Sequence, residues 1–224
     1  DSNFACLKNI VSEGRIIITN IERVSSLYLT KTIYSMILCI LFIILQREYP
    51  FIPIQLSWMS TTAIGIPSFI LTLERIEAVN RTGFLRYVMR YAVPTALTMV
   101  VTMLMIQLFV PFWDGDETMT STMNMLVGTA VSMILLVRLC QPMNLLRRSL
   151  CIAVVIIYCA GVLLVPGLLG IYPIYRWEVV FVIPMICMSA ELTRLFSWFI
   201  NKCYQFRRWM AAKLASLREK LNIG

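Results

Sequence analysis

The stretch SLYLTKTIYSMILCILFIILQ, residues 26–46, decides the fold class. It contains neither glycine nor proline, so it favours one uninterrupted helix. Lys31 is its single charged residue. Because about 20 apolar helical residues cross the hydrocarbon core of a bilayer, this stretch predicts a membrane span.

Further apolar stretches on the C-terminal side are also long enough to cross a bilayer as helices. Prolines and short polar turns separate them, among them PFWDGDET at 111–118 and QPMN at 141–144. The sequence therefore predicts an all-α, polytopic membrane protein with six transmembrane helices. We place the spans at 25–45, 53–73, 88–110, 123–143, 150–171 and 178–200.

The composition agrees with a protein that lies in the lipid bilayer. Of the 224 residues, 59% are hydrophobic and 14% are charged, against about 25% charged in soluble domains. A soluble enzyme is not expected, and the absence of histidine removes the commonest general base and metal ligand. The net charge of +8 does not indicate a nucleic-acid partner, because the basic residues flank apolar runs as they do at a membrane surface.

The basic residues divide unequally between the two sides of the predicted membrane. Arg47 and Arg176 lie on one side, Lys31 lies within a span, and all the others lie on the opposite side. The positive-inside rule then places both termini and the loop at 75–90 in the cytoplasm.

The first helix is longer than a bilayer requires. No glycine or proline interrupts residues 15–49, and a helix of about 35 residues is roughly 50 Å long against a hydrocarbon core of about 30 Å. We expect residues 1–24 to form a cytoplasmic stalk or linker ahead of a transmembrane domain at 25–200. The alternative is a separate interfacial helix before the span.

Residues 201–224 are expected to form a basic cytoplasmic tail. The apolar residues at 209, 214, 217 and 221 can share one face of a helix, with basic residues on the remaining surface. This pattern is typical of an amphipathic helix that lies on a membrane surface. The alternative is a frayed, solvated tail.

Lys31 is the most informative residue inside a span, because an unpaired charge in the membrane costs several kcal/mol. It has polar neighbours in Thr30, Thr32 and Ser35. We interpret Lys31 as a fixed cation that faces a polar cavity. The alternative is a side chain that extends to the cytoplasmic interface.

The second span carries a run of hydroxyl groups followed by residues that disturb a helix. Ser60, Thr61 and Thr62 are consecutive, and Gly65 and Pro67 follow. Proline removes a backbone hydrogen bond and can leave carbonyl oxygens free, and carbonyl and hydroxyl oxygens are ligands of hard cations. We therefore expect part of a cation site here; the alternative is ordinary packing of a kinked helix.

Two kinds of metal site are not expected. The seven cysteines show neither a CxxC pair nor ligand spacing, which argues against zinc and iron–sulfur centres. No acidic residue lies near the middle of a span, which argues against a calcium site built from carboxylates of this chain. Glu191 comes three residues before Arg194, and we interpret this pair as structural.

Two stretches resemble one known family. Residues 1–35 and 49–75 are similar to the fifth and sixth membrane helices of P-type, or E1–E2, cation-transporting ATPases of bacteria. The elements that carry the resemblance are Gly14-Arg15 at the start of a stalk, P-x-Q-L-x-W at 53–58, and G-I-P at 65–67. After residue 75 the resemblance is one of topology, with four further spans and a cytoplasmic C-terminus.

The resemblance implies that the chain is the C-terminal membrane part of such a pump, helices five to ten, in the plasma membrane of the cell. The phosphorylated aspartate of DKTGT, the TGES loop, the GDGxND hinge and helix four would belong to an N-terminal part of the same protein, which would be the partner of this chain. ATP and Mg²⁺ would be cofactors of the full-length pump, and this fragment alone would bind neither and would supply no catalytic residue.

The resemblance also implies which residues of this chain occupy the family's ion-ligand positions. At these positions, every carboxylate of the family is replaced by another residue type. Matching from Gly14-Arg15 puts Thr32 and Ser35 at the ligand positions of helix five, and matching from Pro53 puts Ser60 at a ligand position of helix six. Lys31 lies where the gastric proton–potassium pump also carries a lysine that acts as an internal cation. The expected residues of the ion site and pathway are Lys31, Thr32, Ser35, Ser60, Thr61, Thr62, Gly65 and Pro67.

The sequence therefore predicts the membrane fragment of an ATP-driven cation pump, with calcium or another small metal cation as its substrate. The alternative is a six-helix membrane protein without ATPase activity, such as a secondary carrier or a subunit of a membrane complex. A carrier would show inverted repeats with broken helices in both halves. The second half of this chain has no counterpart of the stretch at 60–67.

Overall fold

The computed structural model describes residues 5–75, 83–110, 116–171 and 180–222. Within these ranges the chain is helical and contains no strand. Six helical segments are long and apolar enough to cross a membrane, which confirms the predicted fold class. They are Ile10–Ile44, Pro53–Leu73, Phe84–Phe109, Glu117–Leu139, Leu145–Leu164 and Val182–Arg207.

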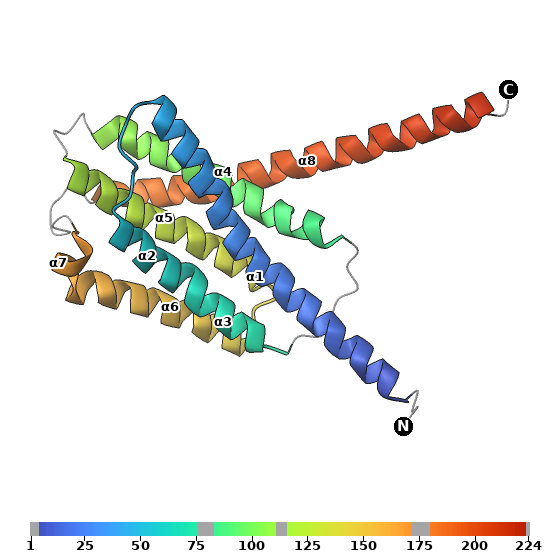
Figure 1. Ribbon diagram of the computed structural model, residues 1–224, viewed down its shortest axis with the longest axis horizontal. Coiled ribbons are helices and arrows are strands. Elements are labelled where there is room, and N and C mark those ends of the chain that lie inside the picture. The colour runs from blue at the N-terminus through green and yellow to red at the C-terminus, as the bar shows by residue number, and fades with distance from the viewer. Residues whose placement is uncertain (1–4, 76–82, 111–115, 172–179, 223–224) are drawn as a thin grey trace.

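Helix α1 (Ala5–Ile44) joins the expected stalk and the first span in one element of 40 residues. Figure 1 shows it crossing the bundle diagonally, with its N-terminal part extending beyond the other helices. The continuous helix was therefore the correct prediction, and a separate helix before the span was not.

The second span consists of α2 (Pro53–Ser60), the π-helical turn η1 (Thr61–Gly65) and α3 (Ile66–Leu73). Pro53 occupies the first turn of α2, where a backbone N–H has no partner within the helix. The buried Gln55 side chain fixes this end of the span, because its Nε2 donates to the carbonyl oxygens of Leu169 and Gly170 at 3.2 and 3.1 Å.

The remaining helices are α4 (Phe84–Phe109), α5 (Glu117–Leu139), α6 (Leu145–Leu164), the short α7 (Pro166–Leu169) and α8 (Val182–Asn222). Helix α5 begins six residues before the predicted start of its span at 123. The Asp116 side chain accepts a hydrogen bond from the backbone N–H of Met119 at 2.8 Å and caps the helix. The polar first turns of α5 are thus helical although hydropathy alone does not mark them.

The main hydrophobic core lies between α1, α2, α4 and α5 and the start of α8. Its buried side chains include Tyr34, Met59, Met99, Met103 and Val127. Helix α1 packs along α4, α4 packs against α8 and α5, and α3 packs against α1 and α6. The second span is therefore held between α1 on one side and α5 and α6 on the other.

The expected C-terminal tail continues the last spanning helix without a break, because α8 is 41 residues long. Figure 1 shows this extension projecting from the bundle. Lys202 lies 5.8 Å from the ring centroid of Trp198, and Lys213 lies 4.9 Å from that of Trp209. The side chains at 214, 217 and 221 lie outside the described part, so the amphipathic face of the tail stays a prediction.

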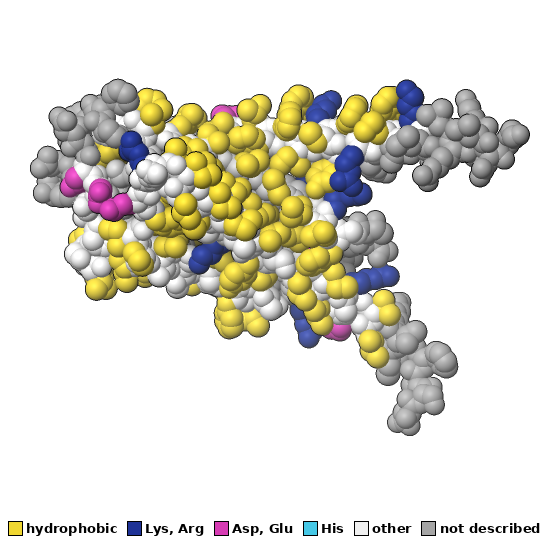
Figure 2. Space-filling view, turned by 45° about the horizontal axis from the view of Figure 1, so that its top comes forward, with side chains coloured by type: hydrophobic (Ala, Val, Ile, Leu, Met, Phe, Trp, Pro, Cys, Tyr) yellow, Lys and Arg dark blue, Asp and Glu magenta, His cyan; other side chains and the backbone are white. Residues whose placement is uncertain are grey.

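Charged side chains are distributed unevenly along the bundle. In Figure 2, basic side chains gather towards the end at which α1 begins and α8 projects, and acidic side chains are most visible at the opposite end. This arrangement is the one that the positive-inside rule requires. The cytoplasmic position of the basic end stays a prediction.

Candidate cation site

The backbone of the second span widens at η1, where the sequence predicted a disturbed helix. The N–H of Ile66 donates to the carbonyl oxygen of Thr61, five residues earlier, instead of to the residue four earlier as in an α-helix. Single π-helical turns within α-helices occur frequently at functional sites. The irregularity is thus a wide turn within a continuous helix rather than a break in it.

Pro67 supplies the physical reason for the wide turn. Proline has no N–H, and in an α-helix its ring collides with the carbonyl group four residues earlier. In a π-turn the N–H of residue 67 would donate to the Thr62 carbonyl oxygen, and in an α-turn it would donate to that of Ala63. Pro67 has no N–H, so neither carbonyl can receive a backbone hydrogen bond from it. Pro67 thus withholds its backbone donor from both of these carbonyl groups, and whether they bind a cation stays a prediction.

The three consecutive hydroxyl groups of the second span have different surroundings. Thr62 is fully buried and donates to the carbonyl oxygens of Trp58 and Met59 at 2.8 and 3.3 Å. The Oγ of Ser60 is buried and has no hydrogen-bond partner within the described chain, whereas Thr61 is exposed. Ser60 is therefore the buried hydroxyl of this run that lacks a partner, whereas the hydroxyl of Thr62 is already satisfied.

The expected site residues on α1 also differ from one another. The buried Oγ of Ser35 has no hydrogen-bond partner among the described residues, while the exposed Thr32 donates to the Tyr28 carbonyl oxygen at 3.1 Å. Lys31 is half-buried, and neither an ion pair nor a hydrogen bond joins it to another described residue. Of these three expected site residues, Ser35 thus presents an unsatisfied hydroxyl and Lys31 an unpaired amine.

The two halves of the expected site are not joined by a hydrogen bond between described residues. Helix α1 packs closely on α3 but not on α2 or η1, and Figure 1 shows α1 and α2 diverging towards the end of the bundle where α1 ends. In the part that the structure describes, no hydrogen bond joins Lys31, Thr32 or Ser35 to the hydroxyl run at 60–62. No group of three potential carboxylate, cysteine or histidine ligands occurs there either.

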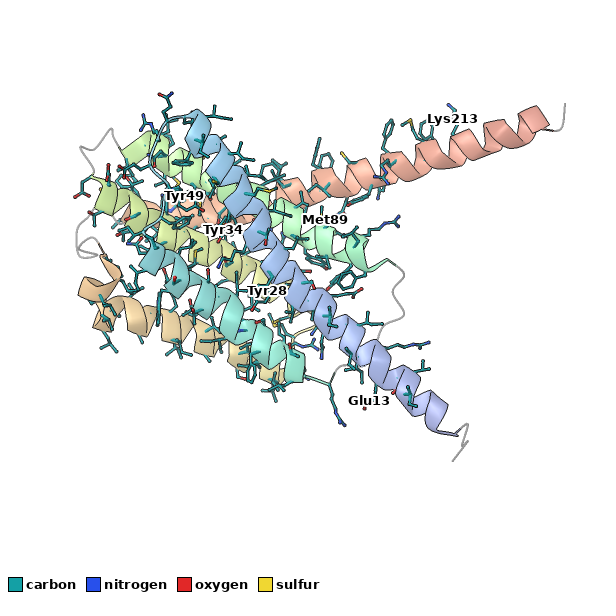
Figure 3. The ribbon with its side chains drawn as sticks, viewed as in Figure 1. Glu13, Tyr28, Tyr34, Tyr49, Met89 and Lys213 are labelled. Atoms are coloured by element: carbon teal, nitrogen blue, oxygen red, sulfur yellow. The ribbon has the colours of Figure 1, made fainter. Side chains whose placement is uncertain are left out.

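Two aromatic residues near the expected site also carry unsatisfied polar atoms. The hydroxyl of Tyr34, a residue only 1% exposed, and the Nε1 of Trp58 have no hydrogen-bond partner in the described chain. Figure 3 shows Tyr34 and Tyr49 close together beneath α1. The sequence analysis did not single out these polar atoms, because an aromatic residue in an apolar run gives no sign of an unpaired polar atom.

A buried cluster of charges lies at the basic end of the second span, and the sequence analysis did not identify it. One Glu74 carboxylate oxygen accepts from Nε of Arg147 at 2.8 Å, and the other accepts from Nη1 of Arg23 at 3.2 Å. All three side chains are at most 7% exposed. The signal available in the sequence was Glu74, an acidic residue directly after a predicted span and next to Arg75.

The charge cluster also holds the turn between α5 and α6. Nη1 of Arg147 donates to the carbonyl oxygens of Cys140 and Pro142. Cys140 is fully buried beside it, and burial raises the pKa of its thiol to about 12. Glu191 and Arg194, by contrast, form the expected ion pair at 2.6 Å on the exposed surface of α8, and its structural role stays an interpretation.

Comparison with known proteins identifies relatives among bacterial cation-transporting ATPases. A Streptococcus pneumoniae protein named as a probable cation-transporting ATPase is 33% identical over 155 residues, which are 66% of this chain and 20% of that protein. A calcium-transporting ATPase of Mycolicibacterium smegmatis is 45% identical over 107 residues, 43% of this chain and 14% of that protein.

A calcium-transporting ATPase of Bacillus subtilis is 29% identical over 77 residues, 34% of this chain and 9% of that protein. The chain thus spans a fifth or less of the length of these relatives. No family model matches the sequence, and no solved structure matches it.

Proposed function

Because the chain is related in sequence to bacterial cation-transporting ATPases of the P type, we propose that it is the C-terminal membrane part of such a pump and supplies part of the ion-binding site. The observation that carries the proposal is the π-turn Thr61–Gly65, with the unsatisfied Ser60 hydroxyl at its start. A wide turn beside an unpaired hydroxyl presents oxygen ligands inside an apolar helix bundle.

The site on this chain is one side of a complete coordination shell. Ser35 on α1 and Ser60 on α2 each have a buried Oγ without a partner in the described chain, and no hydrogen bond joins them. A helix from the N-terminal part of the same protein would lie between them and supply the missing ligands. The substrate is a small metal cation, and calcium is the first candidate because relatives of this chain are named calcium-transporting ATPases.

Lys31 is proposed as the internal positive charge of this site. Its amine has no partner among the described residues and is only half-buried. An unpaired amine of this kind can occupy a position that a second cation would otherwise take. In a site without carboxylates from this chain, it would limit the number of bound cations.

The energy source would lie outside this chain. ATP and Mg²⁺ would bind to the N-terminal part of the full-length pump, and the long α1 would connect that part to the membrane site. Both termini of this chain would then lie in the cytoplasm, and the plasma membrane would be its location.

The test is ATP-driven cation uptake by the full-length protein in sealed, inside-out vesicles. Calcium, magnesium, manganese, potassium and sodium are offered one at a time, and acid-stable phosphoenzyme is measured on the same vesicles. We expect uptake of one small metal cation together with cation-dependent formation of an aspartyl phosphate. Uptake that a proton gradient drives without phosphoenzyme would instead identify a secondary carrier and overturn the proposal.

A further inference from the structure

Three sets of contacts join α1 to α3 along the length of the shorter helix. The Nδ2 of Asn20 donates to the carbonyl oxygens of Thr72 and Glu74 at 3.1 and 2.9 Å. The guanidinium group of Arg23 holds the Glu74 carboxylate. Farther along α1, the hydroxyl of Tyr28 lies 3.4 Å from that of Ser68. Helix α3 is therefore attached to α1 at both of its ends.

The contacts continue from α3 into the π-turn. Ser68 donates to the carbonyl oxygen of Gly65, the last residue of η1, at 2.8 Å. Because Ser68 also faces Tyr28, a displacement of α1 that moves Ser68 also alters the hydrogen bonding at the end of η1. The connection from the stalk helix to the widened turn thus passes through one short helix of eight residues.

The opposite side of Glu74 is fixed to a different part of the bundle. Arg147, on α6, donates through Nε to both carboxylate oxygens at 2.8 and 3.0 Å. Its Nη1 reaches the turn that joins α5 and α6. Glu74 therefore stands between α1, which extends beyond the bundle, and the packed pair of α5 and α6.

Two arginines for one carboxylate are more than charge neutralisation requires. Arg147 alone, with two hydrogen bonds to the carboxylate, already neutralises Glu74. Burying a second guanidinium costs desolvation energy that a single further hydrogen bond at 3.2 Å does not clearly recover. The second arginine is therefore better explained by a role in connecting α1 to α3 than by stability.

We propose that Glu74 is the pivot through which movement of α1 is transmitted to η1, with Arg23 as the moving arm and Arg147 as the fixed arm. These are positioning residues, because they act on the ion site through α3. The proposal rests on the proposed transport function. It differs from a purely structural role in that loss of Arg23 would separate ATP hydrolysis from transport without unfolding the protein.

The test measures ATP hydrolysis and cation uptake on the same preparation of the full-length pump in proteoliposomes. The variants are Arg23→Gln, Arg23→Lys and Tyr28→Phe, and Glu191→Gln is the matched control because its ion pair is 70% exposed. We expect Arg23→Gln to lower the number of cations transported per ATP by about five-fold or more, with a smaller fall for Tyr28→Phe. Arg23→Lys should recover most of the loss, and the control should equal the wild type.

Two results would overturn the pivot. One is an unchanged ratio of cations to ATP in Arg23→Gln and Tyr28→Phe. The other is a parallel fall of hydrolysis and uptake together with the thermal midpoint, which would indicate a structural role alone. If Arg23→Gln does not fold, the ratio of cations to ATP in Tyr28→Phe tests the proposal, because this variant removes only one hydroxyl group. Wild-type uptake is measured first, so that absence of any transport identifies failure of the proposed function itself.

Discussion

The indole ring of Trp58 lies against Gly161 so closely that a Cβ atom on residue 161 would be 2.0 Å from the ring atom Cζ2. The ring belongs to α2 and the glycine to α6, so this contact sets how closely the second span approaches α6. Trp58 also packs with the buried Met125, Tyr158 and Val162. The ring thus has little room in which to move.

Gly161→Ala should therefore destabilise the bundle. A methyl group at this position must displace the indole ring or separate α2 from α6, and overpacking of this kind costs about 1 to 3 kcal/mol. The measurement is the thermal midpoint of the protein in detergent. Gly167→Ala is the control, because nothing lies within 4 Å of a Cβ at residue 167. Equal midpoints for the two variants would contradict the prediction.

The two arginines that bind Glu74 should differ in their effect on stability. Arg147→Gln leaves the buried carboxylate with one hydrogen bond from Arg23, and breaking a buried ion pair costs about 3 to 5 kcal/mol. Arg23→Gln leaves the two hydrogen bonds from Arg147 intact and should cost clearly less. Unfolding in detergent would show this order, and the reverse order would mean that Arg147 is not the fixed arm.

The unsatisfied hydroxyls should matter for cation affinity, and satisfied ones should not. Ser60→Ala and Ser35→Ala each remove an oxygen without a partner, and we expect each to raise the cation concentration for half-maximal ATPase activity by about five- to ten-fold. Ser57→Ala is the control on the same helix, because the exposed Ser57 hydroxyl already donates to the Pro53 carbonyl oxygen at 2.9 Å. An equal effect of all three variants would remove the basis for the assignment.

Replacing Lys31 should raise the apparent affinity for the transported cation. Lys31→Gln removes a positive charge that repels an incoming cation, so half-maximal activation should occur at a concentration about five-fold lower, whereas Lys31→Arg should resemble the wild type. Lys202→Gln, on the exposed part of α8, controls for the loss of a charge elsewhere. Unchanged affinity in Lys31→Gln would mean that the amine extends to the membrane interface.

Cys140 should resist alkylation over an unusually wide pH range. The thiolate is the reactive form, and burial raises the pKa of Cys140 to about 12, so the neutral thiol persists through pH 10. Treatment of the folded protein with a maleimide, followed by mass spectrometry of peptides, should label the exposed Cys203 and leave Cys140 unmodified. Unfolding should abolish the difference. Rapid labelling of Cys140 in the folded protein at pH 8 would show that this region opens.

Features that depend on local sequence, such as the membrane spans, could be predicted from the sequence. The six spans follow from runs of apolar residues, and the continuous first helix follows from the absence of glycine and proline between residues 15 and 49. The irregularity at Pro67 was also predictable, because the loss of an N–H is a covalent property. The formation of a π-turn at this position was not predictable, because it depends on how α2 and α3 pack against α5 and α6.

Contacts between distant parts of the chain could not be predicted. Glu74 binds residues 51 and 73 positions away in sequence, and only the arrangement of α1, α3 and α6 brings them together. The distinction between the satisfied Thr62 and the unsatisfied Ser60 likewise depends on local geometry that a run of three hydroxyl residues does not reveal. The assignment of the ion ligands stays a prediction.

The π-turn makes the second span sensitive to the number of its residues. A hydrogen bond that reaches back five residues encloses one residue more than the α-helical bond, so removing a single residue between Thr61 and Gly65 would restore a regular helix. Because a π-turn takes up one residue more than an α-turn over a similar rotation, α2 and α3 would keep the faces that they present to the bundle. Gln55 and Trp58 could then hold their positions on α7 and α6, and the deletion would remove the wide turn alone, although hydropathy would still indicate an intact span.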